Sequence, residues 1–397
     1  MSGPLLSLLR DGAYARIWLI GLLGNTMRWL EVLAVGIFVF ETTGSALQVA
    51  VITVVRQVPL ALFGSVTGQL AERVNRGRLL ATAFAVTTLS SSTMCALAWT
   101  GSIELWHMVA CAFVSGTCWT MDFPARRTLL GEFCGPERLG AGVSFDSATN
   151  NATRMAGPLS GGILYGLLGL EGAFLFSLAA HAACVVVALS LTVGPTPMAA
   201  ASGSFLRDLR RTVDVVMGSR DLLRIYLFTI VLNVFGFPYA AMIPVLGRAR
   251  YQVEPALIGL LLAVEGAGAF IGALAISLVV RPRWYAPLFV GGSIVFMTGV
   301  ICLSLAPFYW LAVALLFGAG LGMAGFGSMQ STLVLSLAPQ ELRGRLMGLL
   351  SVCIGCSPVG LLTLGLLSDW LGPPTALLLM SATGLALLLA IAIRTRN

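Results

Sequence analysis

The stretch "IWLIGLLGNTMRWLEVLAVGIFVF", residues 17 to 40, is apolar along almost its whole length. A helix needs about 20 such residues to cross the hydrocarbon core of a bilayer, which is roughly 30 Å thick. We therefore expect this stretch to span a membrane. Its middle nevertheless carries Arg28 and Glu31, two charged side chains in a segment that otherwise excludes charge.

The composition extends this interpretation to the whole chain. Of the 397 residues, 57% are hydrophobic and 10% are charged, and the mean hydropathy is +0.92. Soluble globular proteins carry about 25% charged residues. We therefore predict an all-α integral membrane protein, in which charged, proline and glycine clusters separate twelve transmembrane helices. The predicted spans are 15–40, 46–71, 79–100, 105–127, 140–168, 170–193, 222–247, 256–280, 284–306, 309–337, 345–369 and 373–394.

The arginines predict the orientation. All 24 basic residues are arginine, and nineteen of them fall on one side of the predicted spans, with Arg126 and Arg127 counted at the end of span four. Arg248 and Arg250 fall on the other side. Because cytoplasmic loops carry an excess of basic residues, we expect a multi-pass protein of the cytoplasmic (inner) membrane with both termini inside. The net charge of +7 then reflects orientation and membrane lipids, so no nucleic-acid partner is expected.

The chain also repeats itself. "GPERLGAG" (135–142), before span five, resembles "APQELRGR" (338–345), before span eleven, and half of the chain separates them. We predict two pseudo-symmetric six-helix bundles, 1–193 and 222–397, joined by a cytoplasmic linker at 194–221. A duplicated bundle of this kind is typical of secondary transporters, which hold their substrate near the midplane between the halves.

The loop "GQLAERVNRGR" (68–78) resembles the signature of the major facilitator superfamily, which implies the twelve-helix fold of that superfamily. Glu72 stands in place of its Asp, and Asn75 in place of its Gly, where Asn would tolerate a left-handed backbone. Gly68 would let another helix approach closely. We expect a latch here for the state closed to the cytoplasm, although these arginines could instead only set the topology. The latch residues are Gly68, Glu72, Arg73, Arg76, Arg343 and Arg345.

A second motif, "SFDSATNNATRMAGPLSGG" (144–162), resembles the antiporter motif of exporters in that superfamily. Its matching residues are Gly157, Pro158, Gly161 and Gly162, whereas Ser144 and Thr153 replace glycines. With "DFPARRTLL" (122–130), the chain is most similar to the enterobactin-exporter-like and macrolide-efflux-like branch. The resemblance implies export, and Pro158 would bend span five, unless the motif serves packing alone.

Five charged residues fall at one depth of the predicted bilayer. Arg28 and Glu31 lie roughly 20 to 24 Å from the cytoplasmic start of span one, and Arg56, Arg154 and Glu265 come out near the same level. Charges at that depth are costly and usually face a cavity, so we predict a substrate and proton cavity there. Asn25 and Asn233 are assigned to the same cavity. The alternatives are a pair of Arg28 with Glu31 on their own helix and plain interhelical hydrogen bonds of the asparagines.

The absence of lysine bears on the energy source for transport. A chain without lysine cannot form a P-loop, so transport would use an ion gradient, most simply of protons, with Glu31 and Glu265 as carriers. The formal charge of +1 over the five charged residues favours anionic or zwitterionic substrates. We predict a proton-driven exporter of amphipathic small molecules working by alternating access. An uptake symporter or a lipid-like flippase is the alternative, and a receptor or sensor without transport is a distant one.

Other classes of protein have little support. No nucleophile and base pair or histidine cluster appears, so we do not expect an enzyme. Cys353 and Cys356 are the only cysteines at metal-like spacing, and we expect buried thiols rather than a metal, a disulfide or another cofactor. The expected partners are a small-molecule substrate, protons and membrane lipids, and the protein is expected to act as a monomer.

Overall fold

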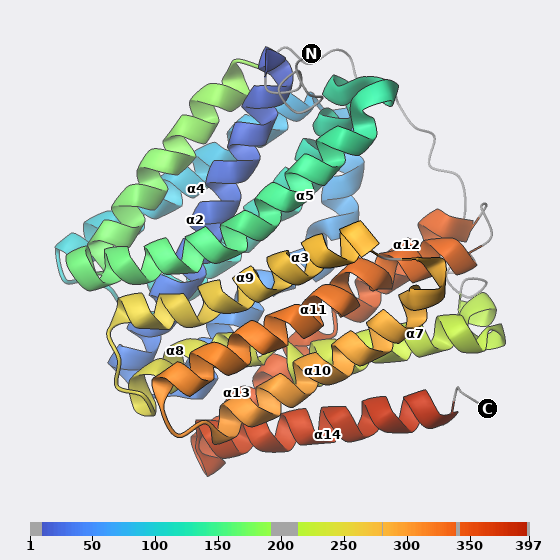
Figure 1. Cartoon of the computed structure of the whole chain (residues 1–397). Helices are drawn as coiled ribbons and strands as arrows, with labels where there is room; N and C mark the ends of the chain where they lie inside the picture. The colour runs from blue at the N-terminus through green and yellow to red at the C-terminus, as the bar shows by residue number, and fades with distance from the viewer. Residues whose placement is uncertain (1–9, 192–212, 280, 339–341, 395–397) are drawn as a thin grey trace. The chain divides into compact units, whose positions relative to one another are not determined.

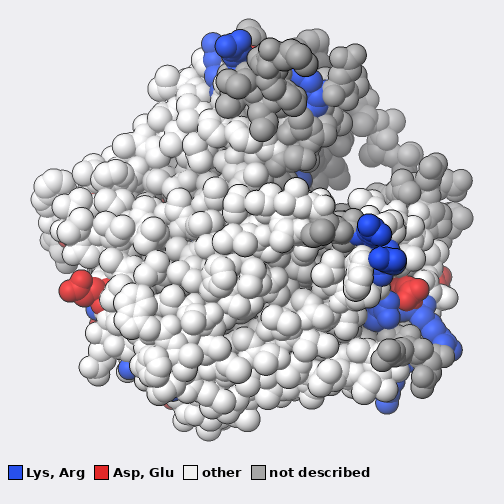
Figure 2. All heavy atoms as spheres, in the orientation of Figure 1, with Lys and Arg blue, Asp and Glu red and all other residues white. Residues whose placement is uncertain are grey.

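The structure, a computed structural model, describes residues 10–191, 213–279, 281–338 and 342–394, and the regular elements of these residues are all helices (Figure 1). Some side chains within helices are not described, at 61, 64–73, 135–137, 139–141, 143, 144, 147, 279, 343–345 and 348. The face in Figure 2 shows charged atoms in small separate groups around a broad uncharged area. Nine helices of the described residues are long and apolar enough to cross a membrane, as the predicted class requires.

Contacts within the chain separate two compact units, which are described one at a time. Unit 1 comprises Met1–Gly44, Ile52–Ala200 and Val253–Ala263, and unit 2 comprises Ser45–Val51, Ala201–Gln252 and Val264–Asn397. The predicted bundles at 1–193 and 222–397 stay a prediction. Of the predicted linker at 194–221, residues up to 212 lie outside the described part of the chain, and 213–218 are helical.

Unit 1 begins with three helices, of which the first two are α2 (Gly12–Thr43) and α3 (Ala46–Arg73), the latter from Ile52 onward. The Asp11 carboxylate caps α2 by accepting a hydrogen bond from the Ala13 N–H at 3.2 Å. At the other end, Gly44 has φ +66°, a left-handed conformation that ends the helix.

The third helix, α4 (Arg76–Trp99), begins at Asn75 in a way that corrects the sequence interpretation. Asn75 has φ −61° and ψ 113°, so it needs no left-handed backbone. Its side-chain oxygen accepts a hydrogen bond from the Arg78 N–H at 3.0 Å. Asn75 therefore acts as a helix N-cap, a position at which Asn is among the preferred residues.

Helix α5 (Leu105–Leu189) is one unbroken helical assignment of 85 residues that folds back on itself. A straight helix of that length would measure about 130 Å. Arg126 and Asp146, 20 residues apart in α5, are nevertheless joined by a hydrogen bond of 2.6 Å, so the chain reverses between them. It reverses again at Gly169, whose φ is +67°. The teal and green lengths of α5 in Figure 1 follow these reversals.

We call the three lengths of α5 the first arm (105–134), the second arm (142–168) and the third arm (170–189). The first arm runs antiparallel to α2, since its residue 119 contacts residue 28 and its residue 126 contacts residue 21. The second arm runs parallel to α2, from Tyr14 beside Gly142 to Glu41 beside Tyr165. The third arm is antiparallel again, because the Cys184 thiol reaches the Ile20 carbonyl and Arg16 donates to the carbonyl of Ser190 just after the arm.

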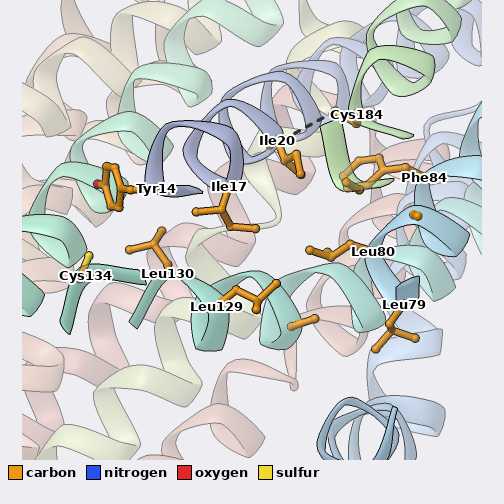
Figure 3. Packing of buried hydrophobic residues seen from close by; sticks show 13 residues of the cluster. Tyr14, Ile17, Ile20, Leu79, Leu80, Phe84, Leu129, Leu130, Cys134 and Cys184 are labelled. Carbon is orange, nitrogen blue, oxygen red and sulfur yellow. Dashed lines mark hydrogen bonds between the residues drawn. The ribbon is translucent and has the colours of Figure 1, made fainter. Parts of the chain in front are cut away.

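The core of unit 1 lies where α2, α4 and α5 meet (Figure 3). Tyr14, Ile17 and Ile20 of α2 are fully buried against the first arm and α4. The Tyr14 hydroxyl donates a hydrogen bond to the Gly142 carbonyl at 3.1 Å, which ties α2 to the start of the second arm. This packing fixes the helices that carry the charged residues of the site.

Unit 2 contains the remaining helices, with α9 contributing from Val264 onward. Its span seven is broken by one π-helical turn, a feature that often accompanies functional sites. The elements are α7 (Arg220–Val231), η1 (Leu232–Gly236), α8 (Tyr239–Ala249), α9 (Pro255–Val279), η2 (Pro282–Trp284), α10 (Tyr285–Leu305), α11 (Tyr309–Leu337), α12 (Arg343–Ile354), α13 (Ser357–Leu371) and α14 (Pro373–Arg394).

The twelve predicted spans correspond to helical segments of the structure but not one to one to helices. Spans four, five and six are the arms of α5, span seven is α7 to α8, and span eleven is α12 with α13. Among the nine apolar helices of the described residues, 148–189 counts as a single helix. The segment 105–127 and the shorter apolar helix Ala46–Leu60 are not among the nine. Charged residues near the end of the first arm, Asp122, Arg126 and Arg127, make it less apolar than the others.

Candidate functional site

A cavity of about 50 Å³ lies inside unit 1, among α2, α3, α4 and the first and third arms of α5. That volume holds a few water molecules, so it suits the polar part of a ligand. Several polar or charged side chains line it: Asn25, Arg28, Glu31, Arg56, Thr87, Ser115, Asp122 and His181. Four residues of the predicted cavity, Asn25, Arg28, Glu31 and Arg56, are thus brought together.

Glu31 is paired across helices rather than within its own helix. Its Oε2 lies 3.6 Å from Nη1 of Arg56 on α3, and both side chains are less than a tenth exposed. Gly116 of the first arm makes this possible, because a Cβ there would lie only 2.1 Å from the Arg56 carbonyl oxygen. The alternative pair of Arg28 with Glu31 is therefore not formed.

Arg28 lies against aromatic rings instead of a carboxylate. Its guanidinium carbon is 3.6 Å from the centroid of the Trp119 ring and 5.9 Å from that of Trp29. Among the described residues it forms no ion pair. A guanidinium stacked on an aromatic face keeps its N–H donors at the ring edge, where they remain available to a carboxylate or phosphate.

Asp122 is a cavity residue that the sequence analysis missed. Its Oδ1 is buried without a hydrogen-bond partner among the described residues and lies 3.8 Å from Arg126 Nε, which also lacks one. Arg126 was counted with the arginines at the edge of the membrane, but its side chain is only 2% exposed. The signal available in the sequence was the spacing of Asp122 and Arg126, one turn apart on a helix.

The charge of the cavity differs from the sequence estimate. Arg28 and Arg56 face Glu31 and Asp122, so the formal charge of the lining is zero rather than +1. Arg154 does not line the cavity; its guanidinium carbon lies 5.5 Å from the centroid of the Trp29 ring. A balanced lining suits a ligand that itself carries both charges.

His181 of the third arm completes the polar lining. Its Nδ1 lies 3.2 Å from the hydroxyl oxygen of Ser91 on α4, and its ring is tilted against Phe84. This is the interhelical contact expected of a lone polar residue in a membrane bundle.

The other two predicted cavity residues belong to unit 2. Glu265 of α9 is buried, and a Cβ at Gly320 of α11 would lie 2.1 Å from the Glu265 carbonyl oxygen. Asn233, inside the π-helical turn, donates a hydrogen bond to the Thr229 carbonyl at 2.9 Å. Gln330, which the sequence analysis did not single out, donates to the Thr229 hydroxyl at 2.8 Å. Unit 2 therefore has a polar cluster of its own.

The antiporter-like motif packs the second arm onto α2. A Cβ at Gly157 would lie 2.4 Å from the Trp29 Cβ, and one at Gly161 would lie 2.8 Å from the Leu30 carbonyl oxygen. Gly162 faces the backbone of Pro255, which belongs to the same unit, and Pro158 lies inside the helix without interrupting it. In the structure these glycines act as contact points for neighbouring backbones.

Most of the predicted latch lies outside the described side chains: Gly68, Glu72, Arg73, Arg343 and Arg345. Arg76, the remaining member, is buried and paired with Glu132 on the first arm. The latch therefore stays a prediction. Among the described residues, no cluster of His, Cys, Asp and Glu could hold a metal ion.

The fold and the site define a multi-pass helical membrane protein with a charged cavity, and comparisons with known proteins specify the class. The family model described as "Transmembrane secretion effector" (MFS_3) matches residues 3–397. The chain therefore belongs to this family of the major facilitator superfamily, whose members are transporters and not enzymes.

Individual relatives are distant. The staphyloferrin A transporter of Staphylococcus aureus is 22% identical over 65% of this chain and 64% of its own length, so the chain aligns with less than two thirds of that relative. Macrolide efflux protein A of Streptococcus pyogenes is 19% identical over 86% of this chain and 85% of its own length. A bacterial homologue of the human lysosomal transporter Spinster, in an inward-facing and unoccupied conformation, has a TM-score of 0.71 at 14% identity, covering 99% of this chain and 96% of that one.

Proposed function

We propose that the protein is a secondary active exporter that moves a zwitterionic amphipathic small molecule out of the cell in exchange for protons. It would act as a monomer in the cytoplasmic membrane, with both termini inside, and would alternate access by rocking its two halves. The observation that carries this proposal is the Arg28 guanidinium, stacked on Trp119 without an ion-pair partner among the described residues, in a cavity shared with Asp122.

The substrate class follows from these contacts. A substrate carboxylate would accept two parallel hydrogen bonds from Arg28, the strongest arrangement for such a pair. A substrate ammonium would lie beside the Asp122 oxygen, which accepts no hydrogen bond among the described residues. Because the cavity of about 50 Å³ holds only these polar groups, the apolar part of the molecule would extend out of it. The name of one relative, macrolide efflux protein A, supports export.

Three dansyl compounds of similar size test the class of substrate. Nε-dansyl-lysine carries a carboxylate and an ammonium, dansylcadaverine lacks the carboxylate, and 6-(dansylamino)hexanoate lacks the ammonium. We expect purified protein in proteoliposomes to accumulate Nε-dansyl-lysine against its gradient in the acidified compartment, because protons leave that compartment in exchange. Arg28→Gln should weaken its binding about tenfold, the cost of about 1.4 kcal/mol of lost charge-assisted hydrogen bonding.

The matched control is Arg127→Gln. Arg127 follows Arg126 on the same arm but is exposed and contacts Phe123. The Arg127→Gln protein should bind and transport Nε-dansyl-lysine as the wild type does. Preferred transport of dansylcadaverine would contradict the zwitterion, accumulation along the direction of proton flow would indicate an uptake symporter, and binding without flux would indicate a receptor.

A further inference from the structure

Unit 1 contains a buried group of charges that the proposed function has used only in part. Arg126 of the first arm donates a hydrogen bond of 2.6 Å to Asp146 of the second arm and lies 3.8 Å from Asp122. Arg126 is 2% exposed and Asp146 is 7% exposed at their side chains. The group combines two carboxylates with one guanidinium, so it carries a formal charge of −1 when both are ionised.

The two carboxylates of this group have unequal surroundings. Asp146 is held by a short charge-assisted hydrogen bond, which stabilises its ionised form. Asp122 has an oxygen without any hydrogen bond among the described residues, and only a loose contact with Arg126. A buried carboxylate that lacks hydrogen bonds loses least when it becomes neutral.

Glu31, one of the two carriers expected from the sequence, is less suited to this role. It is paired with Arg56 at 3.6 Å, so protonation would leave Arg56 as an uncompensated buried charge. Asp122 lines the same cavity, so water can bring a proton to it, and its protonation leaves Arg126 paired with Asp146. Its carboxylate is also where the proposed substrate ammonium would bind.

We propose that Asp122 binds the exchanged proton, in competition with the cationic group of the substrate, and that Arg126 and Asp146 position it. This assignment rests on the proposed function. Protonation of Asp122 removes the negative charge that holds the substrate ammonium, so the substrate leaves when the proton binds. On the cytoplasmic side, where protons are scarcer, Asp122 loses the proton and the substrate binds again. One proton moves inward for each zwitterion that moves outward.

Other ionisable groups surround Asp122 on every side. Those that face it or share its cavity are Arg28 and Glu31 of α2, Arg56 of α3, Cys118 and Arg126 of the first arm, Asp146 of the second arm, and His181 and Cys184 of the third arm. Of these, Arg126 lies 3.8 Å from it, Arg28 shares its cavity, and Asp146 is hydrogen-bonded to Arg126. Gly21 of α2 leaves room for the group, because a Cβ there would lie 2.5 Å from Arg126 Nη1.

The test separates proton binding from transport. Infrared difference spectra of the purified protein, recorded without substrate as the pH is lowered, should show a protonated carboxyl band that Asp122→Asn removes. Glu31→Gln, Glu265→Gln and the exposed control Asp221→Asn should keep it. Asp122→Glu should restore it at a shifted position. A band that persists in Asp122→Asn, or that Glu31→Gln or Glu265→Gln removes, overturns the assignment.

Substrate binding supplies the second measurement. In a weakly buffered solution, Nε-dansyl-lysine should release protons from the wild type and none from Asp122→Asn, whose affinity for it should fall about tenfold and no longer depend on pH. Affinity for 6-(dansylamino)hexanoate should change less than twofold. Equal proton release from Asp122→Asn contradicts the proposal. If the wild type binds none of the three compounds, the substrate class is wrong, and the infrared band alone decides the role of Asp122.

Discussion

At the scale of single residues, the ability of the cavity to bind a ligand depends on which charged side chains are paired with each other. Arg56 and Glu31 hold each other, Arg126 and Asp146 hold each other, and Arg28 lies on an aromatic ring. Intramembrane charges are costly unless they are paired or face a cavity, so the two pairs are structural and the remaining groups are open to a ligand.

A residue-scale prediction concerns Asp146→Asn. The change removes the carboxylate that accepts from Arg126, and breaking a buried pair from one side costs about 3 to 5 kcal/mol in soluble proteins. We expect a clearly lower melting temperature of the purified protein in detergent. The control Asp221→Asn breaks an exposed pair with Arg224 and should melt like the wild type. Equal melting temperatures would show that Arg126 finds another acceptor.

The sequence located part of this site correctly. Arg28, Glu31, Arg56 and Asn25 stood out because a polar residue inside an apolar run needs polar surroundings. Asp122 was missed because counting along a helix placed it near the end of a span, at the edge of the bilayer. Its neighbour Arg126 is held by Asp146 of a separate arm, and no local pattern reveals which arms fold together.

At the scale of elements, glycines set how closely the helices of unit 1 approach. Gly116 brings α3 against the first arm, and Gly161 brings the second arm against α2. The glycine motif was visible in the sequence, but the helix it contacts was not. The reversals inside α5 were expected as breaks between spans; the helical element continues across them, and Gly169 turns the chain with a left-handed φ of +67°.

An element-scale prediction tests this close approach. Gly161→Ala would place a Cβ 2.8 Å from the Leu30 carbonyl oxygen, and since backbone cannot swing aside as a side chain can, α2 and the second arm must separate. We expect reduced thermal stability and weaker Nε-dansyl-lysine binding. Gly166→Ala, five residues further along the same arm, has only contacts of 3.8 Å and should match the wild type. An unchanged Gly161→Ala protein would mean that packing there is loose.

At the scale of the whole molecule, the membrane class was predictable from composition, because apolar content and span length follow directly from bilayer thickness. Orientation is a separate inference from the arginines. We predict that a fluorescent protein fused to the carboxyl terminus is fluorescent in cells, as cytoplasmic fusions are, and that alkaline phosphatase at the same place is inactive. A fusion in the loop with Arg248 and Arg250 should give the opposite pair of results. Active phosphatase at the carboxyl terminus would invert the topology.

The stacking of Arg28 on Trp119 also has an optical consequence. An indole ring 3.6 Å from a cation emits light with a colour and yield that depend on that charge, and Trp119 lines the cavity itself. A molecule that draws the guanidinium away, or that replaces the water beside the ring, alters this emission. The protein thus contains its own optical reporter of occupancy, and a dansyl group held nearby would act as the acceptor of its excitation energy.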